Sequence, residues 1–192
     1  MSPRVDRNIL RVPRRGRSAE AMSFVAQLDD LSGRLFEDLA SCKAAELGWQ
    51  PRRGANSIGM LLAHNAVVEA YWMLVAGEAF TPERLEELLG MGIDGDGIPL
   101  APGGVPPRHL KGRSLAWYRA LHDRARAFTS AQVARWKPAD LDRVVRRRMR
   151  RANAFHECNR RWLLYHVLEH QAGHYGQMLL LRHLFADRRK RP

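Results

Sequence analysis

Hydrophobic positions recur at three- and four-residue steps along most of the chain, which is the period of a helix with one buried face. The apolar side chains of residues 19–47 that follow this spacing are Phe24, Leu28, Leu31, Leu35, Leu39 and Cys42. Gly48 is expected to end this first helix, because glycine is common just beyond a helix C-terminus.

The next apolar run is SIGMLLAHNAVVEAYW, which follows the helix-breaking Pro51. Asn56 or Ser57 can cap a helix here, and we expect it to run to about Ala76. A brief helix is predicted over residues 82–89, where TPERLEELL opens with a capping threonine and a first-turn proline.

Two further helices are predicted in the second half of the chain. Ser114 can cap one of them, and it is expected to end after Trp136, before a proline. The last helix is predicted to begin at Asn153 or Asn159 and to end near Phe185.

These elements predict an all-α protein, a four-helix bundle with a long crossover connection in a single domain over residues 19–186. No alternating valine- and isoleucine-rich run indicates a strand. Residues 90–112 are rich in glycine and proline and are predicted to be an irregular loop. Within it, Asp94 and Asp96 are interpreted as turn residues, because the other ligands of a calcium loop are missing. The arginine-dense segment 139–159 is expected to be an extended crossing segment.

The chain carries a formal net charge of +12, nearly all from arginine. Much of the excess lies in a basic N-terminal arm over residues 1–18, in the RVVRRRMRR stretch at 143–151 and in a basic tail over 187–192. Such arms can bind nucleic acid by neutralising phosphates, but they are more often solvated tails. No aromatic interleaving or recognition motif accompanies them, so nucleic-acid binding is not the favoured function.

The two cysteines, Cys42 and Cys158, are too few for a disulfide framework or a cysteine zinc site. We interpret them as packing residues in a protein from a reducing compartment. No signal-peptide pattern and no uninterrupted apolar run of membrane-spanning length is present. We therefore expect a cytoplasmic protein without a membrane partner.

Three histidines spaced by four, His166, His170 and His174, line one stripe of the last predicted helix. Imidazoles one turn apart can bind one ion, and His64 in the second helix is the best source of a third ligand. Since residues 162–185 are apolar on nearly every face, we expect this helix to be buried. Buried imidazoles need partners for their ring nitrogens, and a metal supplies them. The alternative is that one or two are core histidines bonded to backbone or water.

Gly173 and Gly176 interrupt the last predicted helix, at a cost of about 1 kcal/mol each relative to alanine. Two explanations are open. Either another helix approaches closely at these positions, or the glycines are tolerated in a well-packed core.

The segment SIGMLLAHNAVVEAYW, followed roughly a hundred positions later by HVLEHQAGHYGQMLLLR, resembles the DinB-like (YfiT-like) family. The likeness covers residues 19–185, and its specific motifs are the second-helix histidine and the H-x-x-x-H ahead of G-Q. The resemblance implies a four-helix bundle, often dimeric, in which His64, His170 and His174 bind a divalent metal. Gly173 and Tyr175 stand where the family often has histidine and arginine, which removes no ligand.

Residues 166–170 also fit H-x-x-E-H, the inverted zinc-protease motif, with Glu169 as general base and a distant carboxylate as third ligand. This motif leaves His174 without a role, so we do not favour it. His166 then remains a candidate fourth ligand, a group that supports a ligand, or a proton carrier.

Glu69 and Gln177 are candidates for orienting a ligand's second ring nitrogen or a bound water. For Glu69 the alternative is a surface carboxylate. Aromatic residues close to the ligands in sequence can wall a small-molecule pocket or belong to the core, and these are Tyr71, Trp72, Tyr165 and Tyr175.

Three imidazoles leave open positions on a divalent ion, as in catalytic sites. Zinc or nickel is the expected metal, with iron or manganese as alternatives. The ion would activate water for hydrolysis or, as the resemblance implies, a low-molecular-weight thiol for transfer to a small molecule. The arginine excess suits an acidic substrate or thiol cofactor. The alternative functions are a non-catalytic metal-binding or stress-response homodimer and a basic nucleic-acid-binding protein.

Overall fold

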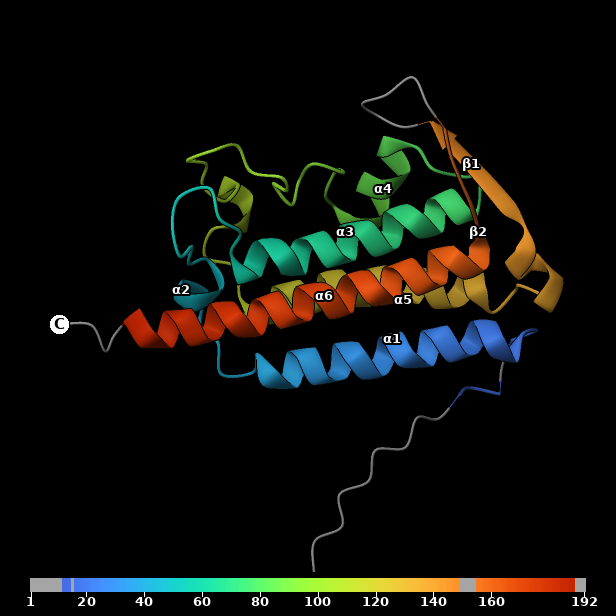
Figure 1. Ribbon diagram of the computed structural model, residues 1–192, viewed down its shortest axis with the longest axis horizontal. Coiled ribbons are helices and arrows are strands. Elements are labelled where there is room, and N and C mark those ends of the chain that lie inside the picture. The colour runs from blue at the N-terminus through green and yellow to red at the C-terminus, as the bar shows by residue number, and fades with distance from the viewer. Residues whose placement is uncertain (1–11, 15, 149–154, 189–192) are drawn as a thin grey trace, which may run out of the picture.

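Four long helices lie side by side in the computed structural model, which describes residues 12–14, 16–148 and 155–188 (Figure 1). They are α1 (Ala19–Asp38), α3 (Ile58–Ala76), α5 (Leu115–Val133) and α6 (Arg160–Asp187). The helices α3 and α5 run in one direction, and α1 and α6 run in the other. The predicted all-α four-helix bundle with a long crossover is therefore confirmed.

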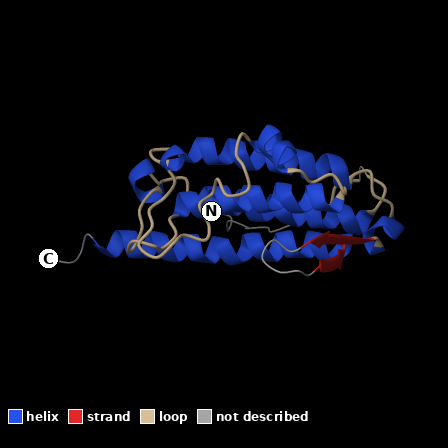
Figure 2. Ribbon diagram, turned by 90° about the horizontal axis from the view of Figure 1, so that it is seen from above, coloured by secondary structure: helices blue, strands red, loops and turns tan. Residues whose placement is uncertain are grey.

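The parallel pair α3 and α5 is joined by the crossover, which contains α4 (Pro82–Leu89) and the 3₁₀ turn η1 (Arg108–Leu110) (Figure 2). Gly90 ends α4 in the left-handed conformation, with φ of 69°, which glycine adopts without a steric penalty. The expected helix over 82–89 and the irregular segment after it are both present. The crossover passes along α3 and brings its aspartates to that helix.

Each long helix begins at a side chain that accepts a hydrogen bond from a backbone N–H of the first turn. These caps are Ser18, Ser57, Ser114 and Asn159. Such a bond satisfies one of the N–H groups that have no partner within the helix. Three of the four caps were predicted from the sequence, while the alternative start at Asn153 lies outside the described residues.

Several boundaries and one element differ from expectation. The first predicted helix is broken after Asp38, and a separate turn of helix, α2, spans Ala44–Leu47. The break was not predicted because buried apolar residues continue across it at helical spacing. These residues are Leu39, Cys42 and Leu47. The helix α5 ends at Val133, and the 3₁₀ turn η2 (Pro138–Asp142) follows.

The segment expected to be an extended crossing segment forms a hairpin of β1 (Val144–Arg148) and β2 (Phe155–Asn159). The strands pair antiparallel with Val145 opposite Cys158 and Arg147 opposite His156. Val145 and Cys158 are buried on the bundle while Val144 is exposed, which is the alternation of a half-buried strand. The strand pairing was not predicted because arginines occupy positions where apolar residues usually mark a strand. Cys42 and Cys158 are both buried and free, as expected of packing residues.

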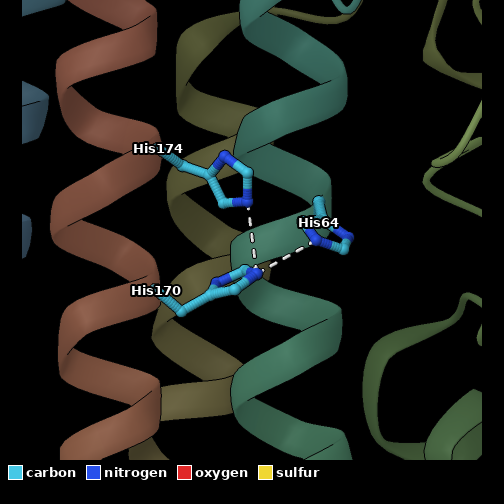
Figure 3. A group of neighbouring side chains, drawn as sticks. All are labelled: His64, His170 and His174. Atoms are coloured by element: carbon cyan, nitrogen blue, oxygen red, sulfur yellow. Dashed lines mark hydrogen bonds between the residues drawn. The ribbon is translucent and has the colours of Figure 1, made fainter.

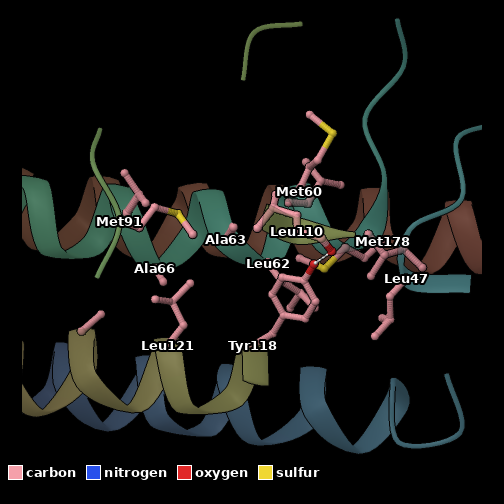
Figure 4. Packing of buried hydrophobic residues seen from close by; sticks show 14 of the residues in the cluster. Leu47, Met60, Leu62, Ala63, Ala66, Met91, Leu110, Tyr118, Leu121 and Met178 are labelled. Atoms are coloured by element: carbon pink, nitrogen blue, oxygen red, sulfur yellow. Dashed lines mark hydrogen bonds between the residues drawn. The ribbon is translucent and has the colours of Figure 1, made fainter. Parts of the chain in front are cut away.

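The helix α3 is the centre of the core and is buried on nearly all sides. Leu62 and Ala66 of α3 lie on the side that faces Tyr118 and Leu121 of α5, whereas Met60 points to the opposite side (Figure 4). Among the described residues, α3 is the one helix long and apolar enough to cross a membrane, and 83% of its apolar window is buried inside the protein. Burial in the bundle accounts for its composition.

The helix α6 is buried along one stripe only, which corrects the expectation of burial on nearly every face. Leu163, Val167 and Met178 face the core, whereas Leu180 and Leu184 are exposed. The reason is geometric, because α6 packs on α1 and α3 and nothing among the described residues covers its outer face. Close approach of another helix does not explain Gly173 and Gly176 either, since both are exposed and an added Cβ would meet nothing within 4 Å.

One buried polar network joins all four long helices. Glu69 of α3 is fully buried, and its carboxylate accepts hydrogen bonds from Arg126 of α5 (Nε–Oε1 2.8 Å) and from Gln171 of α6 (Nε2–Oε2 2.6 Å). Arg126 also contacts α1 through Asp29 at 2.7 Å and Ser32 at 3.2 Å. Burial opposes ionisation of Glu69, but the adjacent Arg126 outweighs it and lowers the pKa of the carboxyl. The pair is therefore charged inside the bundle.

We expect Glu69→Gln to lower the free energy of unfolding by about 3 kcal/mol or more, because it leaves the Arg126 cation inadequately paired in the interior. Urea denaturation followed by circular dichroism measures the change. Asp30→Asn is the matched control, since it breaks an exposed pair with Arg34 and should cost less than about 1 kcal/mol. Equal effects of the two substitutions would contradict the assigned role of the network.

Glycines in the helices should respond to alanine in opposite directions. Gly33→Ala in α1 is expected to stabilise the protein by about 0.5–1 kcal/mol, since an added Cβ would meet nothing within 4 Å and alanine restricts the unfolded chain. Gly59→Ala is expected to destabilise it by about 1–3 kcal/mol, because the methyl group would collide with the buried Tyr118 hydroxyl and lie 3.1 Å from the Leu47 carbonyl oxygen. Thermal melts of the two variants test the sign of each effect.

Candidate metal centre

Three imidazoles meet between α3 and α6, which lie side by side (Figure 3). His64 comes from α3, and His170 and His174 come from successive turns of α6. The Nε2 atom of His170 lies 3.1 Å from His64 Nε2 and 3.2 Å from His174 Nε2. The structure therefore brings together the three side chains that the sequence analysis proposed as ligands.

The protonation pattern of two of these rings is fixed by acceptors at their other nitrogen. His64 Nδ1 lies 2.9 Å from a carboxylate oxygen of Asp96, and His174 Nδ1 lies 2.9 Å from the amide oxygen of Gln177. Because both partners accept, each Nδ1 carries the hydrogen. In the neutral rings, both Nε2 atoms then present a lone pair to His170.

His170 cannot satisfy both of these lone pairs. Its Nε2 carries at most one hydrogen, and its buried Nδ1 has no hydrogen-bond partner. If the hydrogen is on Nδ1, three lone pairs converge; if it is on Nε2, one neighbour remains without a donor. A metal cation at the point of convergence would bind all three lone pairs when the hydrogen of His170 is on Nδ1.

A proton added to His170 or His174 is not that cation. Burial and the neighbouring His174, His64 and His166 lower the pKa of His170 to about 3, and burial also lowers the pKa of His174. Both rings are thus neutral near pH 7, the form in which imidazole binds metals.

The nitrogen separations suit a metal ion. Two ligands at about 2.0–2.1 Å from a tetrahedral ion are about 3.3 Å apart, close to the separations observed here. The donor set consists of neutral imidazoles, which accept zinc, nickel, iron and copper. The geometry is compatible with a divalent metal and leaves further coordination positions for small ligands.

Asp96 is the residue that the sequence analysis missed. It was interpreted as a turn residue, and its Oδ1 does accept the backbone N–H of Ile98 at 2.8 Å. Its other oxygen contacts His64, and the residue is only 1% exposed. A carboxylate behind a ligating imidazole orients the ring and raises its basicity. The sequence offered one signal for Asp96, which is a carboxylate in a long loop whose function was not assigned.

The prediction for Glu69 was wrong. It was expected either to orient a ligand or to lie at the surface, but it is fully buried and bonded to Arg126 and Gln171. It lies five residues after His64, which places it on a different side of α3. Gln177, by contrast, contacts the second ring nitrogen of His174 as expected.

His166 stays outside the three-histidine group. Its ring stacks on Trp162 at 4.7 Å, and its Nδ1 lies 3.0 Å from Glu169. The ring centroid is 6.0 Å from that of His170. The inverted zinc-protease interpretation fails on the same geometry, because it requires His166 beside His170 and gives no place to His174.

The aromatic pocket candidates divide into two pairs. Tyr71 and Trp72 line a cleft of about 410 Å³ together with His64. Tyr165 is 49% exposed on the outer face of α6. Tyr175 donates its hydroxyl hydrogen to Asp38 of α1 and does not line this cleft. Their positions on the α6 helix turn these two tyrosines away from α3.

We expect Asp96→Asn to weaken divalent-metal binding by about 10–100-fold, because the amide still accepts from His64 but lacks the negative charge. Competition with a chromophoric chelator measures the dissociation constant. Asp30→Asn, a surface change on α1, is the control and should leave the affinity unaltered. Unchanged affinity in Asp96→Asn would remove Asp96 from the metal centre.

Comparison with known proteins agrees with this geometry. The sequence model of the DinB superfamily matches residues 27–178, which include all three histidines and most of the four helices. A comparison with curated protein sequences gives no match. By the extent of the family match, the chain belongs to the DinB superfamily.

Proposed function

We propose that the protein binds one divalent metal ion through His64, His170 and His174 and uses it to activate water or a low-molecular-weight thiol on a small molecule. One observation carries this proposal. Asp96 and Gln177 each hold a histidine with its Nε2 lone pair directed at His170, and this convergence of lone pairs suits a cation.

Each residue of the site has a separate role in the proposed function. Three histidines hold the ion, while Asp96 and Gln177 orient two of the rings. Tyr71 and Trp72 provide aromatic walls to the cleft that reaches His64, so a small substrate bound there lies next to the ion. A bound metal would lower the pKa of a coordinated water or thiol and so supply a nucleophile near neutral pH. Zinc or nickel is the metal we favour, with iron or manganese as alternatives.

A homodimer is also part of the proposal. The outer face of α6 exposes Leu180 and Leu184 beside the glycines Gly173 and Gly176. Small residues let two helices approach closely, and exposed leucines gain from being covered. A non-catalytic metal-binding dimer would use the same surface, so activity assays must separate the two functions.

Elemental analysis of protein purified without added metal tests the centre. We expect about one ion per chain in the wild type and almost none in His170→Ala. His183→Ala is the matched control, since His183 is an exposed histidine of the same helix and should retain the metal. Equal metal content in wild type and His170→Ala would refute the proposed site.

Metal removal should also lower thermal stability. A ligand at a hundred times its dissociation constant stabilises the folded state by about 2.7 kcal/mol, which for a chain of this size corresponds to about 5–10 °C. Melting curves with and without a chelator measure this shift, and His170→Ala should show none. A panel of thiols with electrophiles, run beside ester and amide hydrolysis assays, then distinguishes thiol transfer from hydrolysis.

A further inference from the structure

The cleft beside His64 contains a cation that nothing in the proposed metal chemistry uses. Its walls come from α3, from the crossover around residues 93–99 and from Arg147 of β1. Val67, Trp72 and Ile98 make much of the lining apolar. A neighbouring hollow of about 540 Å³ is also lined by Arg147, so this side chain stands between the two spaces.

The guanidinium of Arg147 lies on aromatic rings. Its central carbon is 4.6 Å from the ring centroid of Trp72 and 5.6 Å from that of Tyr71. Its Nη1 donates a hydrogen bond of 2.7 Å to the Tyr71 hydroxyl. Stacking and this bond hold the plane of the guanidinium in one orientation.

Arg147 lacks an anionic partner among the described residues. None of their carboxylates lies within ion-pair distance of it, and its buried Nε has no hydrogen-bond acceptor. Arg126, which is also enclosed by protein, has Glu69 and Asp29 as partners. The Nε of the buried Arg160 donates to the backbone oxygen of Ala76, whereas the buried Nε of Arg147 has no acceptor. Enclosed donors normally have acceptors, and guanidinium donors match carboxylates best.

The two aspartates of the cleft do not fill this role. Asp96 directs its oxygens to His64 and to the Ile98 backbone. Asp94 also has interactions of its own. The cation of Arg147 is therefore available to a ligand in the cleft.

We propose that the cleft binds a small carboxylic acid with an apolar body, whose carboxylate is held by Arg147 and whose body lies along Trp72 towards His64. The fork of one fixed guanidinium matches a carboxylate, and the apolar lining of the cleft suits an apolar body attached to it. The placement of the acid beside a metal rests on the proposed function. The acid site itself depends only on Arg147 and the cleft walls.

A purely structural role predicts different behaviour. If Arg147 only fastens the hairpin to α3 through its aromatic contacts, its replacement would change stability but not the preference for an anion. The test therefore compares an acid with its neutral isostere instead of following binding alone.

Calorimetric titration of the metal-free full-length protein with 3-phenylpropanoate and with 3-phenylpropanamide provides this comparison. We expect the acid to bind at least tenfold more tightly than the amide, and Arg147→Gln to abolish that preference. Arg147→Lys keeps the charge without the planar fork and should retain part of the preference. Arg119→Gln is the matched control, because Arg119 also stacks on a ring, that of Phe36 at 4.4 Å, but does not line the cleft.

Three results would overturn the proposal. They are equal affinity for acid and amide in the wild type, an unchanged preference in Arg147→Gln, and the absence of saturable acid binding up to about 10 mM. Inorganic phosphate serves as a second anionic probe, and tighter binding of phosphate than of the acid would also count against a carboxylate site.

The metal-free condition separates this proposal from the metal centre. If His170→Ala retained metal while the acid preference still required Arg147, the proposed metal site would fail and the acid site would stand. If metal depended on His170 but the acid preference did not depend on Arg147, the acid site alone would fail.

Discussion

The buried ion pair between Glu69 and Arg126 is the constraint on which the arrangement of the bundle depends. Apolar packing between helices tolerates small sliding movements, but a charged pair in the interior must keep its hydrogen bonds. Because Gln171 of α6 completes the same network, the height of α6 relative to α3 is fixed beside His170. The network thus sets the register that brings the imidazoles of two helices to one point.

The candidate site differs from the Glu69 network in how completely its polar atoms are hydrogen-bonded. Around Glu69 every strong donor and acceptor is matched, so the network is complete without a ligand. Around His170, and again at Arg147, polar atoms face the interior or the cleft without sufficient partners. Incomplete polar groups on a rigid scaffold are where a folded protein can bind something else, and we propose a cation and an anion in neighbouring positions here.

Local signals in the sequence predicted much of this arrangement. Ser57 and Ser114 were identifiable as helix caps, and the four-residue spacing of His170 and His174 placed both on one stripe. His64 was proposed as the third ligand because it lies in another apolar helix, and the resemblance implied the same residue. No spacing rule connects it to a helix more than a hundred positions later. The hairpin was missed because Arg146 and Arg147 occupy it, and α2 was missed because Leu39 and Leu47 continue the helical spacing on either side of a turn.

The sequence by itself determined the helices, their caps and the histidines available for a metal, because these depend on residues a few positions apart. Only the tertiary structure decided that Asp96 supports His64, that Glu69 pairs with Arg126 instead, that His166 stacks on Trp162, and that Arg147 reaches the cleft. Each of these contacts joins different elements of secondary structure. Which of two chemically suitable partners a side chain meets depends on how the helices and the crossover pack, and no periodicity along the chain encodes that choice.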